Sequence, residues 1–94
     1  MSQLITIIGI RLLDPNSNES GITHYKYINH EEHQINVLTK AYFIKKYAFL
    51  ISHFLVKSGA AHGPTVTLVK GNPPYLKTPS NSTAKDNLLN LPRF

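Results

Sequence analysis

The chain has 94 residues, of which 41% are hydrophobic, and its formal net charge is +5. This length predicts a single domain, residues 1–94, with one modest core. The sequence contains no cysteine, which excludes disulfides and thiolate zinc sites. It has no apolar run long enough to span a membrane and nothing typical of a signal peptide, so we expect a cytoplasmic protein that does not bind membranes.

The positive charge is unevenly distributed along the sequence. Four of the five acidic residues lie at or before Glu32, and beyond it only Asp86 offsets eight of the ten basic residues. A basic surface of this kind favours a polyanionic partner, either nucleic acid or an acidic protein surface, although solubility alone would also explain it.

The first part of the chain predicts two strands. Residues 3–13 are rich in β-branched side chains with apolar residues on both faces, which is typical of a central strand. Residues 14–21 have the composition of a loop. Residues 22–29 predict a second strand, antiparallel to the first, whereas residues 30–36 are polar and predict an irregular segment. In the second strand, one face carries Thr23, Tyr25 and Tyr27, and the other carries His24 and Lys26.

A helix follows, beginning at Thr39, whose side chain can cap its first turn. Its end is open, because the pattern permits a stop near residue 50 or near residue 58. We choose a helix over residues 39–50 followed by a strand over residues 52–57, since a longer helix would place large apolar residues on its polar face. The apolar residues at helical spacing are Ala41, Ile44, Tyr47, Ala48 and Ile51, and the residues opposite them are Lys45 and Lys46.

The last part of the chain predicts a hairpin. Residues 58–64 form a turn of small residues, residues 65–70 a strand, residues 71–74 a turn and residues 75–78 a short last strand. Residues 79–84 have the composition of a linker. Together the elements predict an α+β fold with a small antiparallel sheet of four or five strands, one principal helix and a docked C-terminal tail.

The tail has an apolar pattern that is unusual for a chain end. Leu88 and Leu91 are three residues apart, so a helical turn would place them on one side. Asp86 is positioned to cap that turn, and Pro92 discourages its continuation. We therefore expect the tail to pack its leucines into the core. The alternative is an exposed peptide that recognises a partner.

The same tail carries a family resemblance. The segments Tyr75-Leu76-x-Thr78 and Asp86-Asn87-Leu88-x-x-Leu91-Pro92 resemble an uncharacterised family of short bacterial and phage proteins, a domain of unknown function. The resemblance implies this order of strands and helix, and it implies no catalytic residue because the family has no settled function. The chain departs from the family at residues 49–52, where a glycine often closes the helix, and over residues 29–34. Weaker matches are Ile5-Thr6 with Ile10-Arg11, Val37-Leu38-Thr39-Lys40 and Val66-x-Leu68.

The sequence holds no convincing catalytic constellation. His30 and His33 flank two glutamates, but a spacing of three in a loop does not fit a helical zinc motif, so we expect a solvated loop and no metal site. Ser58 and His62 lie in a glycine-rich turn that could approach a phosphate, although a hairpin turn explains the pattern adequately. We therefore expect a non-enzyme with no cofactor and no catalytic residues.

Basic residues interleaved with aromatic ones give the remaining functional signal. Lysines neutralise phosphates and aromatic rings stack on bases, whereas in the alternative the aromatic side chains are core and the lysines are solvated. We predict a small basic binding module that contacts nucleic acid or a nucleic-acid-handling complex, for example as a phage-type inhibitor. The alternative is a protein–protein interaction module or homodimer, joined through a strand edge or the apolar helix. The predicted contact residues are Lys45, Lys46, Lys57, Lys70 and Lys77, with Tyr42, Tyr47 and Tyr75.

Overall fold

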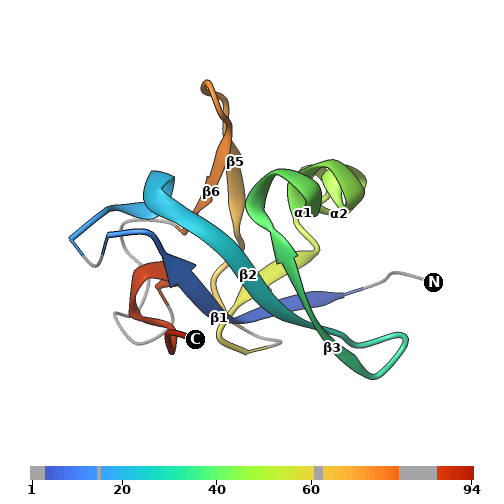
Figure 1. Cartoon of the computed structure of the whole chain (residues 1–94). Coiled ribbons are helices and arrows are strands. Elements are labelled where there is room, and N and C mark those ends of the chain that lie inside the picture. Colours follow the sequence, from blue (N-terminus) through green and yellow to red (C-terminus); the bar gives the residue numbers. More distant parts are fainter. Residues whose placement is uncertain (1–3, 15, 61–62, 79–86) are drawn as a thin grey trace.

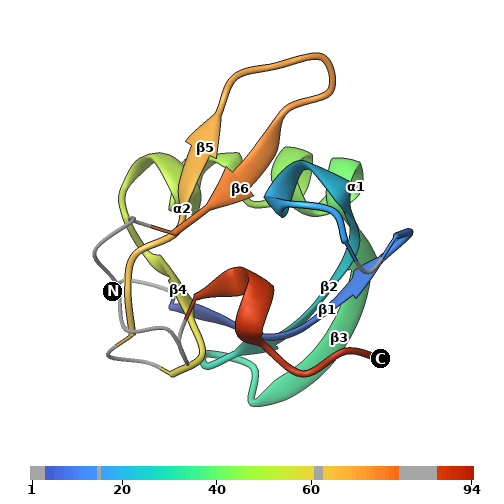
Figure 2. The ribbon, with the colours of Figure 1, turned by 90° about the vertical axis from the view of Figure 1, so that its left-hand side faces the viewer.

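The computed structural model describes residues 4–14, 16–60, 63–78 and 87–94 and confirms an α+β fold (Figure 1). Within these residues, two short helices cover one face of a curved four-stranded sheet, and a two-stranded hairpin stands beside the helices (Figure 2). The strands are β1 (Ile5–Leu12), β2 (Ile22–Asn29), β3 (Gln34–Thr39), β4 (Val56–Ser58), β5 (Thr67–Val69) and β6 (Tyr75–Lys77), the helices are α1 (Lys40–Lys46) and α2 (Ala48–Ser52), and the 3-10 turns are η1 (Glu19–Gly21) and η3 (Leu88–Asn90).

The larger sheet has the strand order β3-β2-β1-β4. The first three strands are antiparallel neighbours, with Tyr25 of β2 beside Ile10 of β1 and Leu38 of β3. β4 runs parallel to β1, with Val56 beside Ile5, so the prediction of an antiparallel sheet is wrong at this position. The reason is the crossover through α1 and α2, which returns the chain to the far side of β1 in the direction of β1 itself.

β3 and a tight turn replace most of the irregular segment expected over residues 30–36. The side-chain Oδ1 of Asn29 accepts hydrogen bonds from the backbone N–H groups of Glu31 and Glu32. His33 adopts a φ of 55°, a left-handed conformation that histidine tolerates better than most residues. These features close a hairpin between β2 and β3. The sequence did not predict this strand, because most of its residues are exposed on both faces and its pattern therefore shows no buried side.

The helical segment begins as predicted and ends later than predicted. Thr39 Oγ1 accepts a hydrogen bond from the backbone N–H of Tyr42 at 3.4 Å and so caps α1. The segment breaks at Tyr47 and ends at Ser52, so the strand expected over residues 52–57 begins only at Val56.

Phe54 lies where a glycine usually closes a helix. Its φ is 60°, and its backbone N–H donates to the carbonyl of Ile51 at 3.1 Å. The N–H of Leu55 donates to the carbonyl of Leu50 at 2.9 Å, which completes a Schellman motif. The helix end therefore has ordinary capping geometry, but it lacks the glycine that would have indicated this end in the sequence.

The buried face of the two helices is rotated from the predicted one. Ala41 and Ala48 are exposed, whereas Phe43 and Leu50 are buried. The larger side chains remove more apolar surface from water, and this burial orients the helices. Ile44, Tyr47 and Ile51 are buried as expected.

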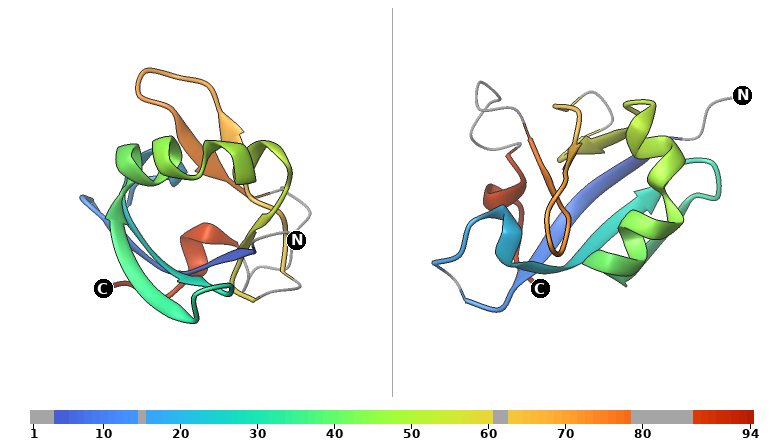
Figure 3. Two further views of the ribbon diagram at one scale, coloured as in Figure 1. Left: turned by 90° about the vertical axis from the view of Figure 1, so that its right-hand side faces the viewer. Right: turned by 90° about the horizontal axis from the view of Figure 1, so that it is seen from above.

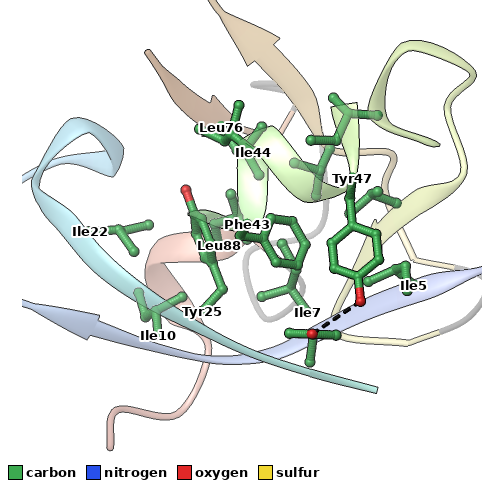
Figure 4. Close-up of a cluster of buried hydrophobic side chains, with 14 of the residues drawn as sticks. Ile5, Ile7, Ile10, Ile22, Tyr25, Phe43, Ile44, Tyr47, Leu76 and Leu88 are labelled. Carbon is green, nitrogen blue, oxygen red and sulfur yellow. Dashed lines mark hydrogen bonds between the residues drawn. The ribbon is translucent and has the colours of Figure 1, made fainter. Parts of the chain in front are cut away.

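The core lies between the sheet, the helices and η3 (Figure 4). Its centre is an aromatic cluster in which neighbouring ring centroids are 5.1 to 5.4 Å apart. The hydroxyl groups of Tyr27 and Tyr47 share a hydrogen bond of 3.1 Å inside this cluster. The four aromatic residues are Tyr25, Tyr27, Phe43 and Tyr47.

The C-terminal tail docks on the domain, as predicted. Leu88 is fully buried and Leu91 is 4% exposed. The side chain of Asn87 accepts a hydrogen bond from the backbone N–H of Leu89 at 3.1 Å and caps η3. The predicted cap Asp86 and the predicted linker over residues 79–84 lie outside the described residues.

Candidate nucleic-acid interface

The five predicted contact lysines come from three parts of the fold. Lys45 and Lys46 are exposed on α1, as predicted from the helical pattern. Lys57 is half-buried on β4, and its Nζ donates to Thr65 Oγ1 at 2.6 Å. Lys70 follows β5 and Lys77 ends β6, so both belong to the exposed hairpin.

The aromatic residues expected to accompany these lysines have different surroundings. Tyr47 is only 8% exposed and belongs to the core, so it cannot stack on a base. Tyr42 is 57% exposed and lines a hollow of about 390 Å³ together with Lys45 and Lys46. Tyr75 is half-buried on β6. The predicted set therefore reduces to one small basic and aromatic surface on α1.

The outer face of the sheet, opposite the helices, gathers other basic residues. The core takes Ile10 and Tyr25, and strand alternation turns their neighbours outward. Arg11 of β1 then lies beside His24 of β2. Lys26 of β2 follows on the same face, between Gly9 of β1 and Val37 of β3. We define Arg11, His24 and Lys26 as the basic face.

The paired strand positions around the basic face hold no acidic side chain. The outward positions that pair across β1, β2 and β3 hold only neutral or basic side chains. The acidic residues of the described chain lie in loops and turns, outside these strand positions. An approaching anion therefore meets positive charge here, with no acidic side chain competing from the paired strand positions. The other outward residues are Thr6, Gly9, Ile28, Ile35, Val37 and Thr39.

Arg11 is held in place by the C-terminal tail. Its Nε donates to the backbone oxygen of Phe94 at 3.1 Å, and its guanidinium carbon lies 4.9 Å from the centre of the Phe94 ring. Within the described part of the chain, Nε is the only side-chain donor of Arg11 with a hydrogen-bond partner. The terminal amino groups of the guanidinium are thus available for an outside phosphate, which they can bind in a bidentate manner.

Gly9 permits this arrangement. A Cβ atom at residue 9 would lie 3.2 Å from the carbonyl oxygen of Pro92 and 3.4 Å from Cδ1 of Phe94. The backbone of the tail pairs with β1 here, since the N–H of Ile10 donates to the carbonyl of Pro92 and the N–H of Phe94 donates to the carbonyl of Ile10. The side chain of Arg93 contacts the tail, because its Nη1 donates to the carbonyl oxygens of residues 89 and 91.

The histidine and glutamate turn has a structural role. His30 Nε2 and Thr6 Oγ1 are 2.7 Å apart, and Glu32 Oε1 accepts from Asn29 Nδ2 at 3.2 Å. Within the described residues, no group of three or more potential ligands could hold a metal ion. Ser58 is buried on β4, and its proposed companion His62 lies outside the described residues.

Comparison with known proteins gives no match, because no family model fits the chain and no curated protein or solved structure is significantly similar to it. No helix among the described residues has the length and apolar character needed to cross a membrane. The site must therefore be interpreted from its own geometry. Sequence reasoning missed Arg11 and Lys26, and the only available signal was their alternation with apolar core residues along two strands.

Proposed function

We propose that the chain is a non-enzymatic module that binds the phosphate backbone of nucleic acid through its basic face. The observation that carries the proposal is the convergence of Arg11, His24 and Lys26 on one sheet face whose paired strand positions hold no acidic side chain. The Phe94 contact adds order, since it fixes Arg11 before a ligand arrives. A group that is already ordered loses less entropy on binding.

A few cations support weak, sequence-tolerant binding. Each neutralised phosphate contributes a slope of about −0.7 for single strands in a plot of log affinity against log salt. Two permanent cations, Arg11 and Lys26, therefore predict a slope of about −1.4. The open and curved sheet suits a flexible single strand better than a groove-bound duplex, so single-stranded nucleic acid is the proposed ligand.

The test is a fluorescence-polarisation titration of a labelled single-stranded oligonucleotide at several salt concentrations. The double variant Arg11→Glu with Lys26→Glu should lower affinity by at least about tenfold and flatten the salt slope. Lys70→Glu with Lys77→Glu makes the same charge change on the hairpin and serves as the matched control. Equal losses in the two double variants, or no binding by the natural chain at low salt, would contradict the proposal.

The surface on α1 is a second candidate for the same function. Tyr42, Lys45 and Lys46 line one hollow, and the exposed ring could stack on a base. Lys45→Glu with Lys46→Glu tests this surface in the same titration. A larger loss in this variant than in the Arg11 and Lys26 variant would assign the binding to α1 instead of the sheet.

A further inference from the structure

The two edges of the larger sheet differ in how they are covered. At the β4 edge, residues 64–66 pair with the strand. The N–H of Val66 donates to the carbonyl of Val56 at 2.8 Å, and the N–H of Ser58 donates to the carbonyl of Pro64 at 3.0 Å. At the other edge, β3 pairs with β2 along its whole length. No described segment pairs with the outer edge of β3, which runs along the outside of the molecule (Figure 3).

The free edge of β3 lacks the usual protection against strand pairing. Natural edge strands carry lysine, proline or a bulge that discourages another strand. β3 has the sequence Gln-Ile-Asn-Val-Leu-Thr, with no charge and no proline, and its register with β2 is continuous. On its outer face, Ile35 is 57% exposed and Val37 is 47% exposed. The strand thus offers both free backbone groups and apolar surface.

We propose that β3 pairs antiparallel with β3 of a second copy of this chain, about a two-fold axis that passes through Asn36. Residues directly opposite in a sheet point to the same face, so only registers that match outer residues with outer residues keep both cores on one side. With Asn36 opposite its own copy, Ile35 faces Val37 of the second copy, and Val37 faces Ile35. The four exposed apolar side chains then form one cluster on the outer face.

The ends of the strand are complementary in charge. The turn before β3 carries Glu31 and Glu32, and the helix after β3 begins with Lys40. Antiparallel pairing brings the acidic turn of each copy to the basic helix start of the other. Neither strand carries a charge along its own length, so no like charges face each other across the pair. These features favour a second copy over a foreign strand.

The dimer has a defined architecture. The two four-stranded sheets join into one continuous sheet, with the helices of both copies on one side. The two basic faces lie together on the other side, flanking the apolar cluster of Ile35 and Val37. The inference is independent of nucleic-acid binding, because it rests on the edge of β3 and not on Arg11 or Lys26.

The first test measures mass as a function of concentration by sedimentation equilibrium. The natural chain should form a dimer that dissociates on dilution. Val37→Lys places a lysine opposite the apolar Ile35 of the second copy and sets the two lysines diagonally across the axis, so it should shift the dissociation constant upward by at least about tenfold. Leu13→Lys, at a side chain that is 86% exposed in a loop, makes the same change as a control. A natural chain that stays monomeric at every concentration, or a Val37→Lys dimer as stable as the natural one, would overturn the proposal.

The second test fixes the register and does not depend on destabilising the dimer. The chain has no cysteine, so a single introduced thiol is unique. In Asn36→Cys the two thiols face each other, with Cα atoms about 4.5 to 5.5 Å apart, within the range that a disulfide bridges. In Gln34→Cys the two Cα atoms are about 13 Å apart and cannot be bridged. Mild oxidation should therefore cross-link the first variant and not the second, and equal rates of cross-linking would overturn the register.

Discussion

Arg93 lies in parallel register beside Ile10, at the strand position that β4 occupies next to the first part of β1. β4 pairs with residues 5–7, and the tail then pairs with Ile10 through two backbone hydrogen bonds of 3.0 and 3.2 Å. Two segments far apart in sequence therefore share one side of β1. The tail is an integral part of the sheet, so changes in it should affect both the stability of the domain and the basic face.

Leu88→Ala should strongly destabilise the domain. Leu88 is fully buried within the core, and truncating a buried leucine costs about 2 to 5 kcal/mol of unfolding free energy. Urea denaturation monitored by circular dichroism measures the change. Leu13→Ala, at an exposed leucine, is the matched control and should change the free energy by less than about 0.5 kcal/mol. Similar effects in the two variants would contradict the docking of the tail.

Phe54→Gly should stabilise the helix end. A left-handed conformation costs a residue with a Cβ atom about 1 to 2 kcal/mol, and glycine avoids this cost while losing about 0.5 to 1 kcal/mol of backbone entropy. We expect a rise in unfolding free energy of up to about 1 kcal/mol. Phe49→Gly is the control, since Phe49 is similarly exposed but lies inside α2, where glycine costs about 1 kcal/mol. The prediction fails if both variants lower the melting temperature.

Local pattern predicted the parts of the fold that depend on neighbours in sequence. The alternation over residues 22–29, the cap at Thr39 and the spacing of Leu88 and Leu91 each identified their element. The parallel placement of β4 depends on the path of the crossover that precedes it. The sequence of a three-residue strand does not indicate whether that strand pairs parallel or antiparallel. The helix end was missed because Phe54 gives no closing signal.

The basic face shows which part of the candidate site could not be predicted from local sequence patterns. Helical periodicity was sufficient to predict that Lys45 and Lys46 are exposed. In contrast, Arg11 and Phe94 are 83 residues apart, and their contact depends on how the tail docks against β1. The position of Arg11 beside His24 likewise depends on the strand register, which includes two irregularities between β1 and β2. These relationships belong to the tertiary structure alone.

Tyr25→Phe and Tyr27→Phe should have opposite effects on stability. The hydroxyl of Tyr25 is buried without a hydrogen-bond partner among the described residues, although the backbone of Leu76 lies near it. Removing an unsatisfied hydroxyl should raise the unfolding free energy by about 1 kcal/mol. Tyr27 donates to or accepts from Tyr47, so its replacement should lower that free energy by about 1 kcal/mol. Equal changes of the same sign in urea denaturation would contradict this assignment.

Stability should fall at alkaline pH. Burial raises the pKa of Tyr25 in the folded chain, and the nearby backbone of Leu76 offsets this only in part. The unfolded tyrosine loses its proton at about pH 10, whereas the folded one retains it, so above that pH the folded state binds more protons and its stability declines. Thermal melts between neutral pH and strongly alkaline pH should show this decline. Tyr25→Phe should make the decline shallower, and an unchanged pH dependence in this variant would contradict the role of Tyr25.

Phe94→Ala should separate the positioning of Arg11 from its charge. The ring lies under the guanidinium and forms a cation–π contact, which fixes the side chain on the basic face. Removing the ring leaves every positive charge in place, so the salt slope of oligonucleotide binding should stay the same while affinity falls by about threefold to tenfold, as expected for the loss of about 0.5 to 1.4 kcal/mol of cation–π energy and order. Arg11→Glu, in contrast, should flatten the slope. Leu68→Ala, at another partly exposed apolar residue, controls for the loss of apolar surface. If Phe94→Ala flattens the slope as Arg11→Glu does, or leaves affinity unchanged while the chain stays folded, Phe94 does not position Arg11 for binding.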